Sequence, residues 1–249
     1  MNNKSKNNFI YGLHAINEAI DSGKNIDKIL IKHDITGAQA KELRDKAKLH
    51  KIPVLRVPIE KINRITRKNH QGAIAFISEI AYFDLEDVLP NIFDSGKIPL
   101  LIILDKITDV RNFGAIARTA ECMGVDAIVV PAKGSAMITA DAVKTSAGAL
   151  HKIPVCRVQD IYKTADYLKD YGIKLVSITE KSNKLISEVD FTEPVALILG
   201  NEEKGISYEL LNKSDEKAKI PMSGTIESLN VSVACSIAIY EAVNQRLKQ

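Results

Sequence analysis

Two spacings of apolar residues alternate along the chain, and together they predict an α/β protein. In the first segment, apolar positions recur every three to four residues where helices are expected and form short runs where strands are expected. The first predicted helix, residues 12–23, ends at Gly23 and has one apolar face, made of Leu13, Ile16, Ala19 and Ile20. The other predicted helices span 37–51 and 59–66, and the strands span 27–32, 53–58 and 72–80.

The second segment carries nearly continuous apolar runs, a pattern typical of parallel strands covered on both faces. These runs are LLIILD at 100–105, AIVV at 127–130, KLVSI at 174–178 and VALILG at 195–200, with helical patterns between them. They predict a domain with a mostly parallel sheet. The predicted organisation is a small α/β domain at 1–80, a linker with one short helix at 81–97, and a larger domain at 98–249.

Composition narrows the class of protein. The chain has 249 residues, of which 45% are hydrophobic and 26% charged, as in ordinary globular proteins. No apolar stretch is long enough to span a bilayer, and the polar start MNNKSKNNF lacks the apolar core of a signal peptide. Cys122, Cys156 and Cys235 are far apart in the sequence. We therefore expect a cytoplasmic protein with buried thiols, without a membrane segment or a metal site.

The net charge of +3 is unevenly distributed along the chain. Residues 1–80 contain 15 Lys plus Arg against 8 Asp plus Glu, giving +7, and the remainder contains 19 against 23, giving −4. A basic module beside a mildly acidic one indicates that the first part holds a polyanion. A solvated lysine surface would produce the same count, so charge alone leaves both interpretations open.

The first candidate cluster follows a predicted strand that ends at Asp105. In LDKITDVRNFGAIARTAECMG, a polar loop leads into a helix with Asn112 at its entrance and Arg118 farther along on another face. Ligands bind in open α/β sheets at loops that follow the carboxyl ends of strands. Taken alone, Asn112 has an ordinary alternative as a helix N-cap, and Arg118 has one as a surface ion pair.

The second cluster, ALILGNEEKGIS, follows another buried strand. Gly200 ends this strand and lets the backbone approach a ligand closely, and Glu202 follows with a carboxylate that suits a cation or a hydroxyl. The alternative is a turn whose acids cap the next helix. The stretch lacks the P-loop lysine, and no GxGxxG follows a predicted strand, so neither nucleotide-binding fingerprint is present.

The third cluster is KIPMSGTIESLN at 219–230, together with the helix that follows. The pattern predicts a short strand at its start, a loop with many donors, and a helix from about Leu229. Ser228 and Asn230 would then lie at the helix N-terminus, where unpaired backbone N–H groups point outward. The alternative is simple capping by Ser228. The helix is rich in small residues, which let another backbone come close.

The order and spacing of these clusters resemble the three motifs of the SpoU/TrmH branch of the SPOUT methyltransferases. The motifs are RNFGAIAR at 111–118, LILGNEEKGIS at 197–207 and IPMSGTIESLNVSVACSIAIYEA at 220–242. In addition, FIYGLHAINEAI at 9–20 and KNHQGAIAFI at 68–77 are similar to the ribosomal-protein-like RNA-binding domain of the ribosomal-RNA members. Within the family, the likeness is greatest to the 23S ribosomal RNA guanosine 2'-O-methyltransferases.

This resemblance implies a fold, a cofactor and a set of site residues. It implies a C-terminal trefoil knot, S-adenosylmethionine as cofactor, ribosomal RNA as partner, and a homodimer with shared active sites. The positions that match cofactor contacts are Gly200, Ile220 and Leu229, and those that match the polar catalytic set are Asn112, Arg118, Glu202, Ser228 and Asn230. Asn201 departs from the pattern, because smaller residues often follow the glycine. A guanidinium keeps its proton, so Arg118 is expected to clamp a phosphate and stabilise the developing alkoxide.

Two other functions fit the same sequence. The substrate could be a transfer RNA or another ribosomal site, or the chain could be an RNA-binding assembly factor without catalysis. The basic first segment favours structured ribosomal RNA. Its aromatic residues are sparse, being only Phe9, Tyr11 and Phe76, which argues against a stacking platform for single strands. All five positions of the polar set carry residues typical of the family, which argues against loss of catalysis.

Overall fold

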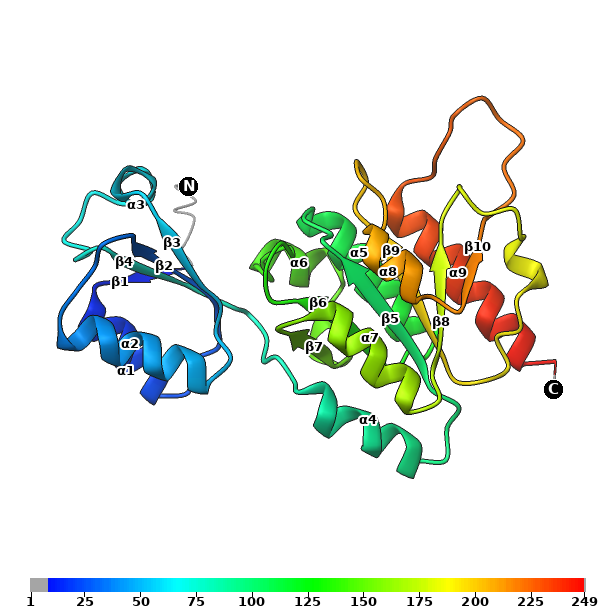
Figure 1. Cartoon of the computed structure of the whole chain (residues 1–249), viewed down its shortest axis with the longest axis horizontal. Helices are drawn as coiled ribbons and strands as arrows, with labels where there is room; N and C mark the ends of the chain where they lie inside the picture. Colours follow the sequence, from blue (N-terminus) through cyan, green and yellow to red (C-terminus); the bar gives the residue numbers. More distant parts are fainter. Residues whose placement is uncertain (1–8, 249) are drawn as a thin grey trace. The chain divides into compact units, whose positions relative to one another are not determined.

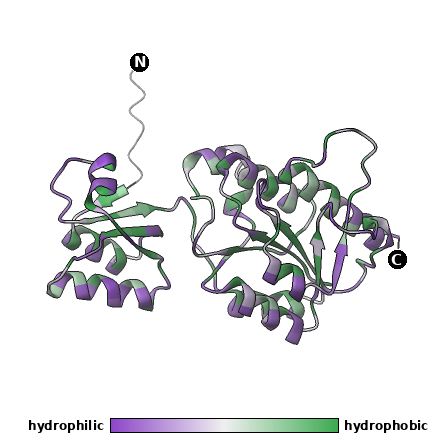
Figure 2. Ribbon diagram, turned by 45° about the horizontal axis from the view of Figure 1, so that its top comes forward, coloured by the Kyte–Doolittle hydropathy of each residue, from purple (hydrophilic) through white to green (hydrophobic). Residues whose placement is uncertain are grey.

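The chain is described here by a computed structural model, which covers residues 9–248. Its contacts divide the chain into two compact units, Met1–Ala81 with Met137–Thr139, and Tyr82–Ala136 with Ala140–Gln249. Figure 2 shows that in each unit the strands are mainly hydrophobic and the helices alternate hydrophobic and hydrophilic stretches. Within residues 9–248, no helix combines the length and the apolar composition needed to cross a bilayer.

The first unit is a four-stranded sheet with helices on both faces (Figure 1). The strand order is β1-β4-β2-β3, with β2 parallel to β3 and the other pairs antiparallel. Buried residues of α1 and α2 pack on one face, and Ile62 of α3 packs on the other. The elements are β1 (Phe9–Tyr11), α1 (Leu13–Asp21), β2 (Ile26–Lys32), α2 (Ala38–Leu49), β3 (Val54–Val57), α3 (Ile59–Ile65) and β4 (Ala73–Ile77).

The second unit is built on a six-stranded sheet in which every pair of neighbouring strands is parallel. The strand order is β10-β8-β9-β5-β6-β7. The elements are α4 (Leu85–Asp94), β5 (Leu100–Asp105), α5 (Val110–Cys122), β6 (Ala127–Pro131), α6 (Ala140–Thr145), β7 (Val155–Val158), α7 (Ile161–Asp170), β8 (Lys174–Ile178), β9 (Val195–Gly200), α8 (Tyr208–Lys213), β10 (Glu216–Ala218) and α9 (Val231–Arg246), with short 3-10 turns at Ala149–His151 and Ile186–Glu188.

Helices cover both faces of this sheet, so the apolar runs of the sequence are its buried strands. One core cluster joins side chains of α4, α7 and α8 to the strands, including Leu89, Leu168 and Leu210. On the other face, α9 packs against α5 and β9. The parallel sheet predicted from the apolar runs is confirmed. Residues 81–97, interpreted as a linker, contain α4, whose buried residues belong to the core of this second unit.

The helix expected from about Leu229 is confirmed, with Asn230 as its N-cap and Val231 as its first residue. Two other local expectations were wrong. The strand expected at the start of 219–230 lies earlier, at β10, whose polar sequence EKA lacks an apolar signature. Cys122 is exposed, whereas Cys156 and Cys235 are buried as expected. Burial raises the pKa of the Cys156 thiol to about 12 and that of Cys235 further still, so both thiols stay protonated.

Arg246 ties the end of α9 to the beginnings of two central strands. Its guanidinium donates hydrogen bonds to four backbone oxygens, those of Ile98, Pro99, Phe191 and Glu193, at 2.7 to 2.9 Å. The segments that supply these oxygens lead into β5 and β9, which are neighbours in the sheet. Arginine suits this position because its rigid fork carries several donors in one plane.

We expect Arg246→Ala to lower the free energy of unfolding of the second unit by about 2–4 kcal/mol, because several charge-assisted hydrogen bonds are lost together. Urea unfolding followed by amide hydrogen exchange in α9 measures this loss. Lys248→Ala is the matched control, because Lys248 is an exposed cation two residues farther along. Equal effects of the two substitutions would show that the four hydrogen bonds contribute no specific stability.

Candidate active site at the carboxyl ends of the central strands

Three loops converge where parallel strands β5, β8 and β9 end. Asp105 and Gly200 pair at the ends of β5 and β9, and β8 runs beside β9 on the other side. Because the strands are parallel, the loops after all three leave from the same edge of the sheet. The irregular segment 219–230 reaches this edge and leads into α9.

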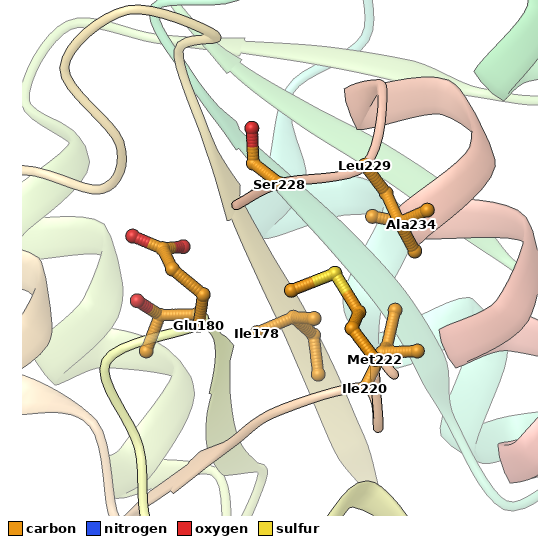
Figure 3. A pocket seen from close by; sticks show the side chains of 8 residues that line it. Ile178, Glu180, Ile220, Met222, Ser228, Leu229 and Ala234 are labelled. Atoms are coloured by element: carbon orange, nitrogen blue, oxygen red, sulfur yellow. The ribbon is translucent and has the colours of Figure 1, made fainter. Parts of the chain in front are cut away.

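A cavity of about 270 Å³ lies between these loops, close to the lower end of the range for small-molecule sites. The ends of β8 and β9, the loop 200–206 and the beginning of α9 line it. A smaller recess of about 70 Å³ adjoins it and shares part of its lining. Figure 3 shows this recess, with Ile178, Ile220, Met222 and Leu229 forming the apolar part and Ser228 and Glu180 the polar part.

All three positions expected to bind the cofactor border these cavities. Gly200 and Leu229 line the larger one, and Ile220 and Leu229 line the smaller recess. Of the polar positions, Ser228 and Glu202 also line the larger cavity. The loop that begins at Gly200 and the segment that begins at Ile220 are thus brought to one site, because the chain returns along β10 between them.

Gly200 is required because the protein backbone folds back on itself there. A Cβ at position 200 would lie 2.1 Å from the carbonyl carbon of Gly205 and 2.1 Å from the backbone nitrogen of Ile206. No side chain fits in that space, because backbone atoms cannot move away as a flexible side chain could. The sequence suggested a close approach to a ligand, and the structure shows a close approach of the chain to itself.

Asn201 organises the loop that follows. Its Oδ1 accepts hydrogen bonds from the backbone nitrogens of Glu203 and Lys204, and its Nδ2 donates to the oxygen of Lys106. This is an Asx-type turn, which an asparagine forms and a smaller aliphatic residue does not. The departure from the family pattern at this position therefore has a structural role.

Asn112, Glu202 and Asn230 form one chain of hydrogen bonds across 118 residues of sequence. Asn230 Nδ2 donates to Asn112 Oδ1 at 3.1 Å, and Asn112 Nδ2 donates to Glu202 Oε1 at 2.6 Å. At the other end, Asn230 Oδ1 accepts from the backbone nitrogen and the hydroxyl of Ser232. This series of hydrogen bonds thus runs from the positive N-terminus of α9 to the Glu202 carboxylate, and it fixes the orientation of both amides.

The simple capping alternatives for these residues are wrong. Asp109 is the N-cap of α5 and accepts from the Asn112 backbone nitrogen, so Asn112 lies inside the helix. Asn230, rather than Ser228, is the N-cap of α9. The helix after Gly205 is preceded by Ser207, and neither Glu202 nor Glu203 caps it. The Asn112 and Glu202 side chains therefore cap no helix, and they form a hydrogen bond with each other instead.

Arg118 lies apart from the other polar positions. It is an exposed residue of α5 and is not part of the lining of either cavity. Among residues 9–248, no hydrogen bond or salt bridge of its guanidinium is found, so the ion pair considered as its alternative is also missing. Within one copy of the chain, Glu202 and Ser228 line the cavity, Asn112 and Asn230 are joined to Glu202 by hydrogen bonds, and Arg118 lies outside.

The loop after β8 contributes residues that the sequence did not indicate. Thr179, Glu180 and Lys181 line the larger cavity, and Thr179 and Glu180 also line the recess. A single acid after a short strand forms no recognisable motif, so only the position of β8 beside β9 reveals it. The sequence also did not indicate that Asp105 stabilises the loop 200–206. Its Oδ2 accepts a hydrogen bond from the backbone nitrogen of Ser207 at 2.7 Å and so holds the end of this loop.

The lining of the larger cavity is acidic on balance and suits a cationic ligand. It includes four acids, Glu180, Glu202, Glu203 and Glu227, against two lysines, Lys181 and Lys204. A sulfonium with an amino group carries positive charge that such carboxylates offset. Among residues 9–248, no three His, Cys, Asp or Glu side chains gather in a way that could hold a metal ion.

Comparison with known proteins identifies the family. Residues 99–240 match the SpoU rRNA Methylase family, and residues 9–83 match the family described as RNA 2'-O ribose methyltransferase substrate binding. The chain belongs to the SpoU rRNA methylase family. It is accordingly an RNA methyltransferase with S-adenosylmethionine as its cofactor, as the motifs predicted. Membership also implies the C-terminal trefoil knot.

Relatives of the SpoU family resemble the chain over nearly its full length. A Staphylococcus saprophyticus protein assigned to the TrmH family of tRNA/rRNA methyltransferases is 37% identical over 237 residues, covering 95% of each chain. The solved structure of an rRNA methyltransferase from Sinorhizobium meliloti with bound AdoMet has a TM-score of 0.60 and 26% identity, covering 94% of this chain and 85% of that one.

A second solved structure shows the same fold. The SpoU methyltransferase AviRb from Streptomyces viridochromogenes, in complex with AdoMet, has a TM-score of 0.62 and 24% identity. The similarity covers 97% of this chain and 91% of that one.

The hydrogen-bond chain can be tested by reversing its polarity. Asn112→Asp keeps the side-chain size but replaces the donor to Glu202 by a second carboxylate, so we expect the methyl-transfer rate to fall about tenfold or more. The double variant Asn112→Asp with Glu202→Gln restores one donor between the two positions, and we expect the rate to recover to within about threefold of wild type.

Asn112→Asp combined with Glu203→Gln is the matched control, because it removes one carboxylate from the same loop outside the hydrogen-bond chain. We expect this control to stay as slow as Asn112→Asp alone. Recovery in both double variants would mean that net charge, rather than the hydrogen bond, sets the rate. Single-turnover kinetics with saturating S-adenosylmethionine measure the effect.

Proposed function

We propose that the protein methylates the 2'-oxygen of a ribose in 23S ribosomal RNA, at a guanosine, in the cytoplasm. The hydrogen-bonded Asn112, Glu202 and Asn230 at the edge of the acidic cavity are the observation that carries this proposal. A polar set of this kind can position a hydroxyl nucleophile beside a cofactor pocket. The basic first unit and its match to a substrate-binding family support RNA as the molecule that delivers this hydroxyl.

The cavity residues divide into three roles. Backbone groups at Gly200, Ile220 and Leu229 hold S-adenosylmethionine, and the apolar side chains of the recess exclude water from it. When bound, this cofactor supplies an electrophilic methyl group on a sulfonium. Asn112 and Asn230 position the loop and the substrate ribose, Glu202 holds Asn112, and Ser228 orients the substrate from the cavity wall.

A second copy of the chain completes the site by contributing Arg118. In a single copy this guanidinium is exposed on α5 and outside the cavity lining. Helix α9 borders the surface that carries Arg118, because α5 packs on α9 with Thr119 Oγ1 and Ser236 Oγ 3.0 Å apart. On α9, Val233 and Tyr240 leave 46% and 60% of their surface exposed. Such apolar exposure on a small-residue helix is typical of an interface.

Arg118 acts in this scheme as a clamp and not as a base. A guanidinium keeps its proton at any ordinary pH, so it can bind a phosphate next to the target ribose with two parallel donors. Its charge then stabilises the developing alkoxide. This arrangement requires the planar fork of arginine, which lysine does not provide.

Transfer RNA is the second candidate substrate, favoured by the TrmH family assignment of the Staphylococcus saprophyticus relative, which names both RNA classes.

Mapping ribose methyl groups by mass spectrometry distinguishes these candidates. We compare ribosomal and transfer RNA from cells with and without the protein, and treat the unmodified RNA with purified protein and S-adenosylmethionine. We expect one guanosine of the large ribosomal RNA to lose its 2'-O-methyl group in the cells and to regain it in vitro. A change confined to transfer RNA would replace the proposed substrate, and no change in either RNA would contradict both candidate substrates.

Mixed dimers test whether the partner supplies Arg118. One tagged protomer carries Arg118→Ala and the other carries Gly200→Val, which blocks the loop 200–206 by backbone overlap. We expect both homodimers to be inactive and the purified mixed dimer to be active, because one intact cavity meets one intact Arg118. An inactive mixed dimer would place Arg118 in the site of its own chain.

Arg118→Lys in both protomers tests the clamp separately. We expect kcat to fall about tenfold or more, because two parallel hydrogen bonds to a phosphate are lost while the charge remains. Nearly full activity of the lysine variant in steady-state kinetics would show that charge alone is sufficient.

A further inference from the structure

Three aromatic side chains gather on one face of the sheet in the first unit. Phe9 and Tyr11 are two positions apart along β1 and therefore point to the same face of the sheet. Phe76 of β4 lies opposite Phe9 in the antiparallel register. The ring centroids of Phe9 and Phe76 are 6.2 Å apart, and those of Phe9 and Tyr11 are 6.4 Å apart. We call this set, Phe9, Tyr11 and Phe76, the aromatic platform.

The aromatic platform is the less covered part of its sheet face. Ile62 of α3 is buried against Leu30 of β2 and Val57 of β3 on this face. The platform residues pack beside this core but keep part of their surface accessible. They occupy β1, which is an edge strand, and β4 next to it. The opposite face, under α1 and α2, is closed by a larger buried cluster.

Two lysines approach the rings of the platform. The ammonium of Lys28 lies 5.5 Å from the ring centroid of Phe76, and that of Lys68 lies 5.8 Å from the ring centroid of Tyr11. The stretch 59–78, which supplies α3, β4 and the loop between them, contains four cations against the single acid Glu60. The cations are Lys61, Arg64, Arg67 and Lys68. The platform is thus aromatic at its centre and positively charged at its edge.

We propose that the aromatic platform binds unpaired bases of the substrate RNA by stacking, while Lys28 and Lys68 contact the adjoining phosphates. Accessible rings bordered by cations match a ligand that presents flat aromatic faces and negative charge at regular intervals, which is a single-stranded nucleic acid. A duplex does not match, because its bases are already stacked on one another. An apolar protein partner would be opposed by the two ammonium groups that it must desolvate.

The small number of these aromatics argued against such a platform, but the pairing of β1 with β4 gathers all three on one face of the sheet. Residues 67 positions apart become direct neighbours in the sheet. β1 is only three residues long and carried no clear strand pattern, so its partner could not be inferred. The proposal rests on the proposed function for the identity of the RNA, and it adds that the recognised element contains unpaired nucleotides.

Photocrosslinking locates the bound bases directly in the full-length protein. The probe is a ten-nucleotide oligouridine with 5-iodouridine at single positions, and crosslinked peptides are identified by mass spectrometry. We expect crosslinks on Phe9, Tyr11 or Phe76. Crosslinks confined to other parts of the chain would overturn the proposal, and because the protein is wild type, this result does not depend on the folding of any variant.

Leucine variants test the contribution of stacking. Tyr11→Leu, and Phe9→Leu with Tyr11→Leu, keep an apolar side chain on the sheet but remove the aromatic face. We expect affinity for the oligouridine to fall about tenfold per stacked base, with affinity for a duplex of equal length unchanged within about twofold. Lys68→Ala should instead reduce the slope of log affinity against log salt by about 0.7, as for one lost phosphate contact.

Tyr171→Leu is the matched control, because Tyr171 is an exposed aromatic residue of the second unit. We expect it to bind the oligouridine as the wild type does. Platform variants that fold, as judged by circular dichroism, and still bind single strands like wild type would overturn the proposal. Equal loss of duplex and single-strand binding would also overturn it, because it would indicate a general electrostatic or structural effect.

The methylation assay separates this proposal from the proposed function. If methyl transfer to RNA occurs but platform variants bind the oligouridine normally, the stacking proposal is contradicted and the proposed function stands. If no RNA is methylated but crosslinks fall on the aromatic platform, the proposed function is contradicted and the stacking proposal stands. If a protein bound the aromatic platform, it would crosslink to the platform residues and displace the oligouridine. This outcome would contradict the proposal.

Discussion

The site depends on one place where the backbone passes over the end of its own strand. The space beside Gly200 is filled by the backbone of Gly205 and Ile206, which leaves no room for a side chain. This overlap holds the loop 200–206 against β9, and Asn201 and Asp105 fasten the two ends of the loop by hydrogen bonds. The cavity wall and the position of Glu202 both follow from this geometry. A loop that left the strand without turning back would leave the cavity open on that side.

The second requirement is that three segments far apart in sequence keep one arrangement. Asn112 comes from α5, Glu202 from the loop after β9, and Asn230 from the first position before α9. Because each amide donates with one atom and accepts with the other, their chain has a direction set by the helix N-terminus at one end and the carboxylate at the other. The site is therefore assembled by tertiary structure and is absent from any isolated motif.

Much of this arrangement could be predicted from the sequence, since the apolar runs of β5, β6, β8 and β9 and the apolar face of α1 are strong periodic signals. What could not be predicted is short, polar or dependent on distant partners. The strands β1 and β10 have three residues each, too few to show a period. Ser228 and Asn230 are both good capping residues, and the one that caps α9, Asn230, also donates to the Asn112 amide, which is remote in sequence.

The position of Glu180 and the relation of Arg118 to the cavity could not be predicted, for different reasons. Glu180 was missed because one acid after a short strand has no characteristic spacing, and only the order of strands in the sheet brings it to the cavity. Arg118 was recognised by its motif, but its relation to the cavity is not contained in a single copy of the chain. In the first case the missing information is tertiary, and in the second it would come from the proposed second copy of the chain.

The helix α9 is fastened at both ends, and this has a consequence for how cofactor and fold influence each other. Asn230 anchors its start beside the cavity, and Arg246 anchors its finish against the entries to β5 and β9. Between these anchors, Val231 and Ala234 form part of the cavity wall. A molecule bound there interacts only with the state in which the helix is docked, so by mass action it shifts the local opening equilibrium toward that state. Occupancy of the pocket and resistance of the C-terminal helix to undocking are therefore thermodynamically linked.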